Sequence, residues 1–182
     1  MSTSDDQRFI RFWYEIDINK FKPCGGDKWI PLNKGGGGRK WFGNNIFVIN
    51  WEDDGKEIKL FAKELYGSVT RTIKNMGYYF KSVLTWGRVS GNNPTFRYFP
   101  SGFIFTDIGC CLFADKECEL FNALGFLNSE YGKRYLKLQS KNVKVETGHV
   151  KSLPYSSDIQ VGSDVNKLIE IFKKDWNEYE LL

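Results

Sequence analysis

The sequence has few of the residues on which most catalytic and metal sites depend. It contains one histidine, His149, and four cysteines, Cys24, Cys110, Cys111 and Cys118, which form no Cys-x-x-Cys pair. A Ser-His-Asp or Cys-His site therefore has a single candidate base, and no ligand group has the spacing of a zinc site. We expect neither catalytic nor metal-binding residues, so the chain by itself is not expected to be an enzyme.

Long apolar segments are also missing. The N-terminus reads Met-Ser-Thr-Ser-Asp-Asp, without the cationic and apolar regions of a secretory signal. No apolar run approaches the ~20 residues that a membrane span needs. We therefore expect a cytoplasmic protein that has no membrane partner and whose four cysteines are reduced and mostly buried.

Glycine is concentrated at Gly35–Gly38, but not in the pattern of a nucleotide-binding loop. No Gly-Lys-Ser/Thr follows the run, the GxGxxG spacing is absent, and the next predicted element is a strand rather than a helix. The run is flanked instead by Lys34, Arg39, Lys40 and Trp41. Four glycines give the backbone wide conformational freedom. The sequence therefore predicts a mobile, cationic and aromatic loop suited to a polyanion.

Aromatic residues are abundant, at 16% of the chain, with six Trp, nine Tyr and fifteen Phe. Most are expected in the core, but exposed aromatic rings also stack on bases and sugars. The net charge of +4 is uneven, because residues 1–98 carry sixteen Lys and Arg against ten Asp and Glu, whereas residues 99–182 carry ten against twelve. The basic N-terminal half favours a nucleic-acid partner, with ordinary surface variation as the alternative.

Hydrophobic periodicity predicts an α+β fold in which a β-rich, basic N-terminal half packs with a helical C-terminal half. We expect one domain over residues 1–182. Strands are predicted at 8–18, 29–30, 46–51, 78–88, 95–99, 102–106 and 108–113. Helices are predicted after Glu52, over 116–128, after 128–129 and over 163–177.

An ordered series of segments resembles one protein family. Lys34-Gly35-Gly36, Arg39-Lys40-Trp41-Phe42-Gly43-Asn44-Asn45 and Val48-Ile49-Asn50-Trp51 are similar to the "KGG…RKWYGN…VVNWENDG" block of large N6-adenine DNA methyltransferases. That block lies in their C-terminal target-recognition domain, and the most similar type is the BREX (phage growth limitation) phage-defence enzyme. Related domains occur in type IIG restriction-modification enzymes and type I specificity subunits. Further similar segments are 54–55, 78–81, 85–86, 102–105, 126–129 and 148–154.

The resemblance implies sequence-specific DNA recognition by a piece of a longer, S-adenosylmethionine-dependent enzyme. The family's Asn-Pro-Pro-Tyr motif lies upstream in such proteins, whereas the only Asn-Pro here is Asn93-Pro94, followed by Thr95. Methyl transfer to N6 of adenine is therefore expected elsewhere, with no cofactor in this domain. The implied partners are double-stranded DNA, the catalytic domain of the same polypeptide and other phage-defence proteins. His149 stands where the family usually has an acidic residue.

Candidate DNA-contacting residues follow from side-chain chemistry. Cations bind phosphates, Arg reads guanine, Asn reads adenine, and aromatic rings stack. The expected phosphate contacts are Lys34, Arg39, Lys40, Lys74 and Lys81. The expected base readers are Arg88, Arg97, Asn44, Asn45, Asn92 and Asn93, and the stacking candidates are Trp41, Tyr78, Tyr79 and Trp86.

Each group has a structural alternative. Asn44 and Asn45 are also typical of a turn into a strand, and Trp86 is equally suited to the core. The alternative for the whole chain is a protein-interaction module whose aromatic surface binds a phage-defence partner or an inhibitor that mimics DNA.

Overall fold

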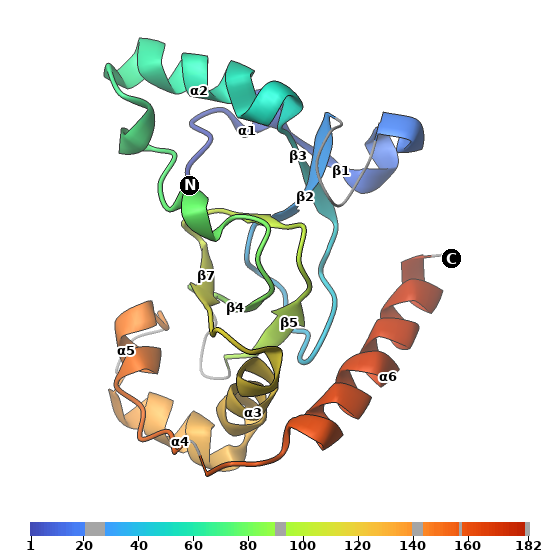
Figure 1. The fold of residues 1–182 in the computed structure, drawn as a ribbon, viewed down its shortest axis with the longest axis vertical. Helices are drawn as coiled ribbons and strands as arrows, with labels where there is room; N and C mark the ends of the chain where they lie inside the picture. Colours follow the sequence, from blue (N-terminus) through green and yellow to red (C-terminus); the bar gives the residue numbers. More distant parts are fainter. Residues whose placement is uncertain (21–27, 90–93, 140–143, 157, 181–182) are drawn as a thin grey trace. The chain divides into compact units, whose positions relative to one another are not determined.

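The computed structural model describes residues 1–182 except 21–27, 90–93, 140–143, 157 and 181–182, and it shows a mixed α+β protein (Figure 1). The predicted fold class is confirmed. The chain forms two compact units whose segments interleave along the sequence. The first unit comprises residues 1–34, 45–81 and 100–107, and the second comprises 35–44, 82–99 and 108–182.

The first unit contains a four-stranded sheet in the order β1-β3-β2-β6. Strands β1, β3 and β2 are antiparallel neighbours, whereas β6 runs parallel to β2. Buried β-branched residues such as Ile30, Val48 and Ile49 form its core, and because the consecutive residues Val48 and Ile49 are both buried, β3 is covered on both faces. The strands are β1 (Ile10–Phe12), β2 (Trp29–Asn33), β3 (Phe47–Asn50) and β6 (Ile104–Phe105).

Helical segments complete the first unit. The predicted helix after residue 51 is confirmed as α2, which buries Ile58 and Ala62 and ends at the left-handed Gly67. The strand predicted over 8–18 is only three residues long, because the Asp5 carboxylate caps a helical turn just before it. These segments are α1 (Asp6–Phe9), η1 (Trp13–Glu15), η2 (Ile18–Lys20), α2 (Glu52–Tyr66), η3 (Val69–Arg71) and η4 (Met76–Tyr78).

The second unit contains an antiparallel three-stranded sheet in the order β5-β4-β7. The predicted pairing of the strands before and after residues 91–94 is confirmed, with Thr85 opposite Arg97. Trp86 is 1% exposed and its Nε1 donates to the Val145 carbonyl at 2.8 Å, so the core alternative holds for this residue. The strands are β4 (Val83–Gly87), β5 (Arg97–Phe99) and β7 (Gly109–Leu112).

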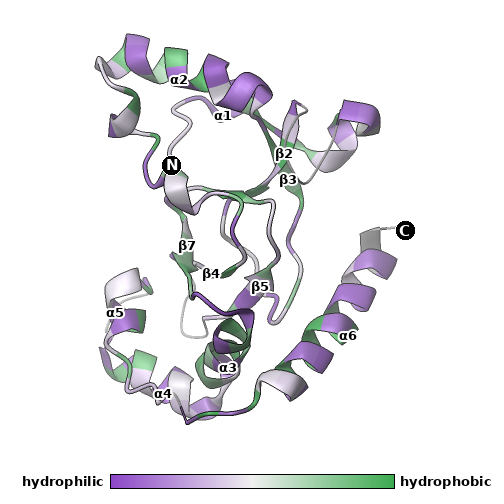
Figure 2. Cartoon of the chain, in the orientation of Figure 1, coloured by the Kyte–Doolittle hydropathy of each residue, from purple (hydrophilic) through white to green (hydrophobic). Residues whose placement is uncertain are grey.

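Four helices belong to the same unit as this sheet. Helix α3 packs closely on α6, because a Cβ on Gly125 would lie 3.0 Å from a methyl group of Val165. Hydrophilic and hydrophobic residues alternate along α2 and α6, as expected for helices with one buried face (Figure 2). No described helix combines the length and the apolar character that a membrane crossing needs. The helices are α3 (Glu117–Asn128), α4 (Glu130–Gln139), α5 (Thr147–Lys151) and α6 (Gly162–Glu180).

Candidate nucleic-acid interface

The glycine loop, residues 35–44 of the second unit, has a backbone that other residues rarely adopt. Gly35, Gly36 and Gly37 have φ values of 71°, 77° and 68°, in the left-handed region that glycine enters without a steric penalty. A Cβ on Gly35 would also lie 2.8 Å from the carbonyl oxygen of Ile108. The glycines are therefore required for a specific conformation and a close approach, in addition to the freedom that they give the chain.

Arg97 lies beneath this loop and has no exposed surface. Its Nη2 donates to the Gly36 carbonyl at 2.6 Å and its Nη1 to the Gly37 carbonyl at 3.5 Å. Its Nε is buried without a hydrogen-bond partner, and burial lowers the pKa of the guanidinium to about 10. The expectation that Arg97 lies on an exposed face is wrong, because its side chain points inward and holds the loop.

Asn44 donates a hydrogen bond to the same carbonyl group of the loop as Arg97. It has a left-handed φ of 66°, and its Nδ2 donates to the Gly36 carbonyl at 3.1 Å. This bond supports the turn alternative for Asn44. Asn45 is half-buried, and its Oδ1 is buried without a hydrogen-bond partner. Asn92 and Asn93 lie outside the described residues.

Trp41 is held in a strained conformation. Its φ is 67°, which is unusual for a bulky side chain and costs about 1–3 kcal/mol. Its backbone pairs with β5, because the Trp41 N–H donates to the Phe96 carbonyl at 3.0 Å and the Tyr98 N–H donates to the Trp41 carbonyl at 2.9 Å. The half-buried indole is thus fixed at the end of the glycine loop.

Arg39 lies against α6. Its Nη1 is 2.7 Å from an Asp175 carboxylate oxygen, and its Cζ lies 4.9 Å from the centre of the Trp176 ring. Gly43 lets these groups approach, because a Cβ there would lie 2.9 Å from both the Arg39 side chain and the Trp176 ring. The sequence identified Arg39 but neither of its two neighbours, since contacts between residues so far apart leave no local signal.

Lys40 belongs to a cationic cluster that includes part of α4. Lys133 Nζ lies 2.6 Å from a Glu130 carboxylate oxygen. Burial and the neighbouring Lys133 ammonium lower the pKa of Lys40, whereas Lys133, Arg134 and Lys40 lower the pKa of Glu130. Three cations thus surround one carboxylate, and we call this group the Lys40 cluster. The sequence missed Lys133 and Arg134, because the pattern of this segment indicates only a packing helix.

A second group of predicted residues lies in the first unit. Lys74, Tyr78 and Lys81 are exposed, and the Lys81 Nζ is 5.2 Å from the centre of the Tyr78 ring. Exposed Met76 and Phe80 lie in the same segment. We call residues 74–81 the Tyr78 segment. Cationic and aromatic side chains on one surface are what nucleic-acid backbones and bases require.

Tyr79 is the exception in the Tyr78 segment. It is 5% exposed, its hydroxyl donates to the Lys74 carbonyl at 3.0 Å, and its ring packs edge-on against Phe105 and Trp51. Burial raises the pKa of its phenol. The prediction that Tyr79 is available to stack on a base is wrong for this conformation, because the ring belongs to the core of the first unit.

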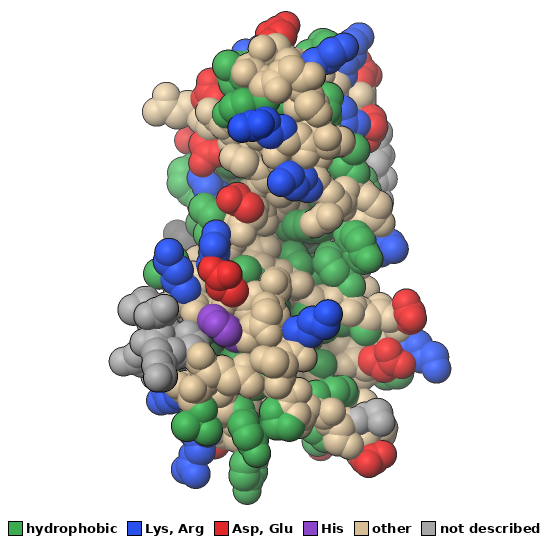
Figure 3. All heavy atoms as spheres, turned by 90° about the vertical axis from the view of Figure 1, so that its left-hand side faces the viewer, with side chains coloured by type: hydrophobic (Ala, Val, Ile, Leu, Met, Phe, Trp, Pro, Cys, Tyr) green, Lys and Arg blue, Asp and Glu red, His purple; other side chains and the backbone are tan. Residues whose placement is uncertain are grey.

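The remaining predicted cations are ion-paired. Lys34 Nζ lies 2.8 Å from an Asp6 carboxylate oxygen in the first unit, and Arg88 Nη2 lies 2.8 Å from a Glu146 carboxylate oxygen in the second. Both pairs are partly exposed, so each contributes little to stability. On the face drawn in Figure 3, Lys and Arg side chains are interspersed with Asp and Glu.

The histidine and the described cysteines do not form a metal or catalytic cluster. His149 Nδ1 accepts a hydrogen bond from the Glu146 N–H at the start of α5. Cys110 is buried, Cys111 is half-buried and Cys118 is exposed, so the expectation of mostly buried thiols is wrong for the described cysteines. Cys24 lies outside the described residues. Within the described ranges, no three His, Cys, Asp or Glu side chains gather as potential metal ligands.

Comparison with known proteins relates the chain to adenine-specific methyltransferases. No protein-family model matches it. The chain is 36% identical over 176 residues to the adenine-specific methyltransferase BrxX of Escherichia coli O9:H4 (strain HS), covering 94% of the chain and 14% of that relative. It is 33% identical over 189 residues to the adenine-specific methyltransferase PglX of Lacticaseibacillus casei (strain Zhang), covering 99% of the chain and 16% of that relative. The chain is thus homologous to a minor part of each enzyme.

Proposed function

We propose that this chain is the DNA target-recognition segment of an N6-adenine-specific, S-adenosylmethionine-dependent DNA methyltransferase of a phage-defence system. The observation that carries the proposal is that nearly the whole chain matches only 14–16% of two adenine-specific methyltransferases. In the proposed enzyme, another part of the polypeptide binds the cofactor and transfers the methyl group. This segment holds the duplex while the target adenine leaves the base stack.

The Lys40 cluster and the Tyr78 segment are the proposed phosphate-contacting surfaces. The Lys40 cluster carries three cations around one exposed carboxylate, so an approaching phosphate meets net positive charge. In the Tyr78 segment, Lys74 and Lys81 contact phosphates and the exposed Tyr78 ring stacks on a sugar or base. Each surface lies within one unit, so each can be tested by itself.

Arg88, Trp41 and Asn45 are the proposed groups closest to the bases, and Arg39 is a proposed phosphate contact. Arg39 and Arg88 are ion-paired to the exposed carboxylates of Asp175 and Glu146. Such exposed pairs are weak because solvent screens their charges, so DNA can displace the carboxylate. Asn92 and Asn93 remain proposed adenine readers outside the described residues.

Fluorescence anisotropy with a labelled duplex, measured across a salt series, tests the proposal. We expect Lys40→Ala plus Lys133→Ala to weaken binding and to reduce the salt dependence by about 0.9 for each phosphate that is no longer neutralised by a lysine. The matched control is Lys173→Ala plus Lys174→Ala on α6, which removes the same charge from two other ion-paired lysines. Equal effects of the two double variants, or no binding by the wild type at low salt, would contradict the proposal.

An exposed apolar stripe on α4 favours a second function. Tyr131, Tyr135 and Leu138 are 74%, 43% and 75% exposed and lie at i, i+4 and i+7 of one helix. Exposed apolar surface of this kind is typical of protein contacts. If the wild-type chain binds no duplex at low salt, the stripe makes a protein-interaction module the better interpretation.

A further inference from the structure

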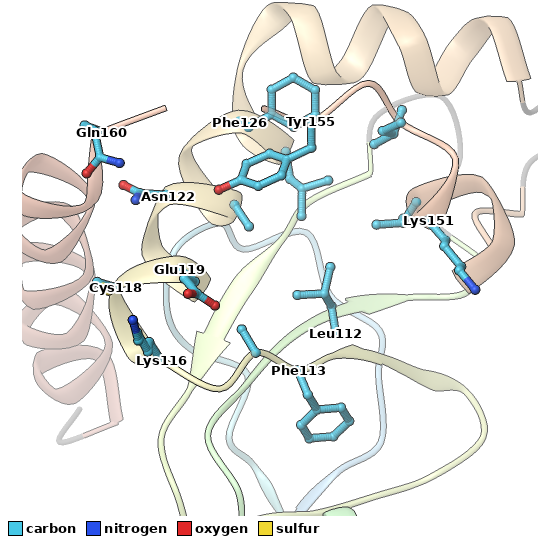
Figure 4. Close-up of a pocket in the computed structure, with 15 residues that line it drawn as sticks. Leu112, Phe113, Lys116, Cys118, Glu119, Asn122, Phe126, Lys151, Tyr155 and Gln160 are labelled. Carbon is cyan, nitrogen blue, oxygen red and sulfur yellow. The ribbon is translucent and has the colours of Figure 1, made fainter. Parts of the chain in front are cut away.

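A cavity of about 670 Å³ lies in the second unit, between α3, α5 and the end of β7 (Figure 4). This volume is typical of sites for small molecules, which fill about 300–1,000 Å³. Leu112, Leu127 and Val150 contribute to an apolar lining. The rings of Phe126 and Tyr155 meet at 65° with their centres 5.7 Å apart. The two rings are in contact with each other, so a flat apolar group can pack against the surface that they form.

The charged residues around this cavity are unequally distributed. Lys116 and Glu119 lie on one side, and Lys151 lies on the opposite side (Figure 4). Among the described residues, neither lysine takes part in an ion pair, in contrast to Arg88 and Lys133 of the same unit. Glu119 partly offsets the charge of Lys116, so Lys151 dominates the field on its own side. The Lys151 side chain extends away from the other lining residues in Figure 4, and its flexible stem lets the ammonium group turn toward an anionic group at the rim of the cavity.

Tyr155 adds a neutral hydrogen-bond donor. Burial, Glu119 and Cys118 raise the pKa of its phenol, so its hydroxyl stays protonated at neutral pH. The phenol can donate to an oxygen of a bound molecule. The cavity thus combines an apolar space, aromatic rings and a hydrogen-bond donor with an ammonium group at its rim that forms no ion pair with the described residues.

We propose that this cavity binds a planar aromatic carboxylate, with its ring against Phe126 and Tyr155 and its carboxylate toward Lys151. The site is independent of the proposed DNA contacts, because none of the Lys40 cluster or the Tyr78 segment lines it. The ring of the ligand buries apolar surface in the cavity. Its negative charge makes it bind more tightly than neutral or cationic ligands of the same shape.

Three naphthalene probes of matched shape test this assignment. Naphthalene-2-carboxylate, its neutral amide and 2-(aminomethyl)naphthalene are titrated into the full chain by isothermal calorimetry. We expect the carboxylate to bind with a Kd of about 1 mM or lower, as expected for a ligand of this size. The amide should bind more weakly and the amine weakest. Absence of carboxylate binding at millimolar concentration, or tighter binding of the amine, would overturn the proposal.

Charge variants on the two sides of the cavity give effects of opposite sign. Lys151→Met should weaken carboxylate binding about fivefold, whereas Glu119→Gln should strengthen it by a similar factor. Neither should change the binding of the amide. Both side chains are exposed, so neither variant is expected to impair folding. Equal or reversed effects would exclude the assigned ligand class.

The location of the site is tested separately. Ala123→Phe should fill the cavity and abolish binding of all three probes, and bound carboxylate should slow alkylation of the exposed Cys118, which also lines the cavity. Site-resolved mass spectrometry with half-buried Cys111 as the internal reference distinguishes local protection from a general effect. Unchanged alkylation of Cys118 at saturating probe would place the ligand elsewhere and overturn the proposal.

Discussion

At the level of single residues, the buried Arg97 lowers the stability of the folded protein but fixes the conformation of the glycine loop. Its guanidinium is buried, its Nε has no hydrogen-bond partner among the described residues, and burial lowers its pKa from the ordinary value to about 10. That decrease corresponds to about 3 kcal/mol of destabilisation of the folded state while the group is charged. The folded protein loses this proton at lower pH than the unfolded chain, so the cost is present at all pH values below about 10. The structure thus keeps an energetically costly side chain under the glycine loop.

We therefore expect Arg97→Met to leave global stability nearly unchanged while it loosens the loop. Removing the buried charge offsets the missing hydrogen bonds to Gly36 and Gly37, so the free energy of unfolding in urea should change by less than about 1 kcal/mol at pH 7. Amide hydrogen exchange over residues 36–39 should accelerate about tenfold or more. Arg88→Met, which removes an exposed arginine, serves as the control. A stability loss above about 3 kcal/mol with unchanged loop exchange would contradict this account.

The sequence identifies the chemistry of such residues better than their surroundings. It predicted that Arg39, Lys40 and Trp41 are important from their types and their position beside the glycines. It did not predict that Arg97 points inward, because burial depends on a loop more than fifty residues earlier in the chain. The same reason explains why Lys133 was missed, since its proximity to Lys40 exists only in the folded chain.

At the level of elements, two glycines in helices have opposite expected roles. Gly132 of α4 is buried, and a Cβ there would lie 2.3 Å from the backbone carbonyl oxygen of Phe126. No side-chain rotation can relieve a clash with backbone. Gly148 of α5 has open space around the same position. The close junction of α3 and α4 therefore requires glycine, whereas α5 does not.

We expect Gly132→Ala to lower the free energy of unfolding by about 2 kcal/mol or more. The identical change at the control position, Gly148→Ala, should raise it by up to about 1 kcal/mol through better helix propensity. Urea denaturation followed by circular dichroism measures both variants. A similar effect of the two changes would show that the α3–α4 junction adapts to an added methyl group.

Helices and strands with strong periodicity were predictable, but their partners were not. The pattern of Leu120, Leu124 and Leu127 predicted α3, and the run around Val48 predicted β3. By contrast, no sequence signal shows that β6 joins the first sheet in parallel with β2 while β7 pairs with β4 in the second. Strand partners depend on which apolar faces meet after folding, and alternation along one strand carries no such information.

At the level of the whole molecule, the candidate DNA contacts are divided between the two units. The Tyr78 segment belongs to the first unit and the Lys40 cluster to the second. The sequence similarity to the two relatives extends over both units, since the matches cover 94% and 99% of the chain. If both surfaces contact the same duplex, each should add its own counterion release to the total salt dependence of binding.

This additivity is a testable property of the whole chain. Lys74→Ala plus Lys81→Ala and Lys40→Ala plus Lys133→Ala should each reduce the slope of log Kd against log salt concentration by about 2, and the quadruple variant should reduce it by about 4. The decreases in binding free energy should also add, because the two surfaces belong to different units and have no residue in common. Anisotropy titrations of the four proteins between low and physiological salt measure both quantities. A quadruple variant no weaker than one of the double variants would mean that only one unit contacts the duplex.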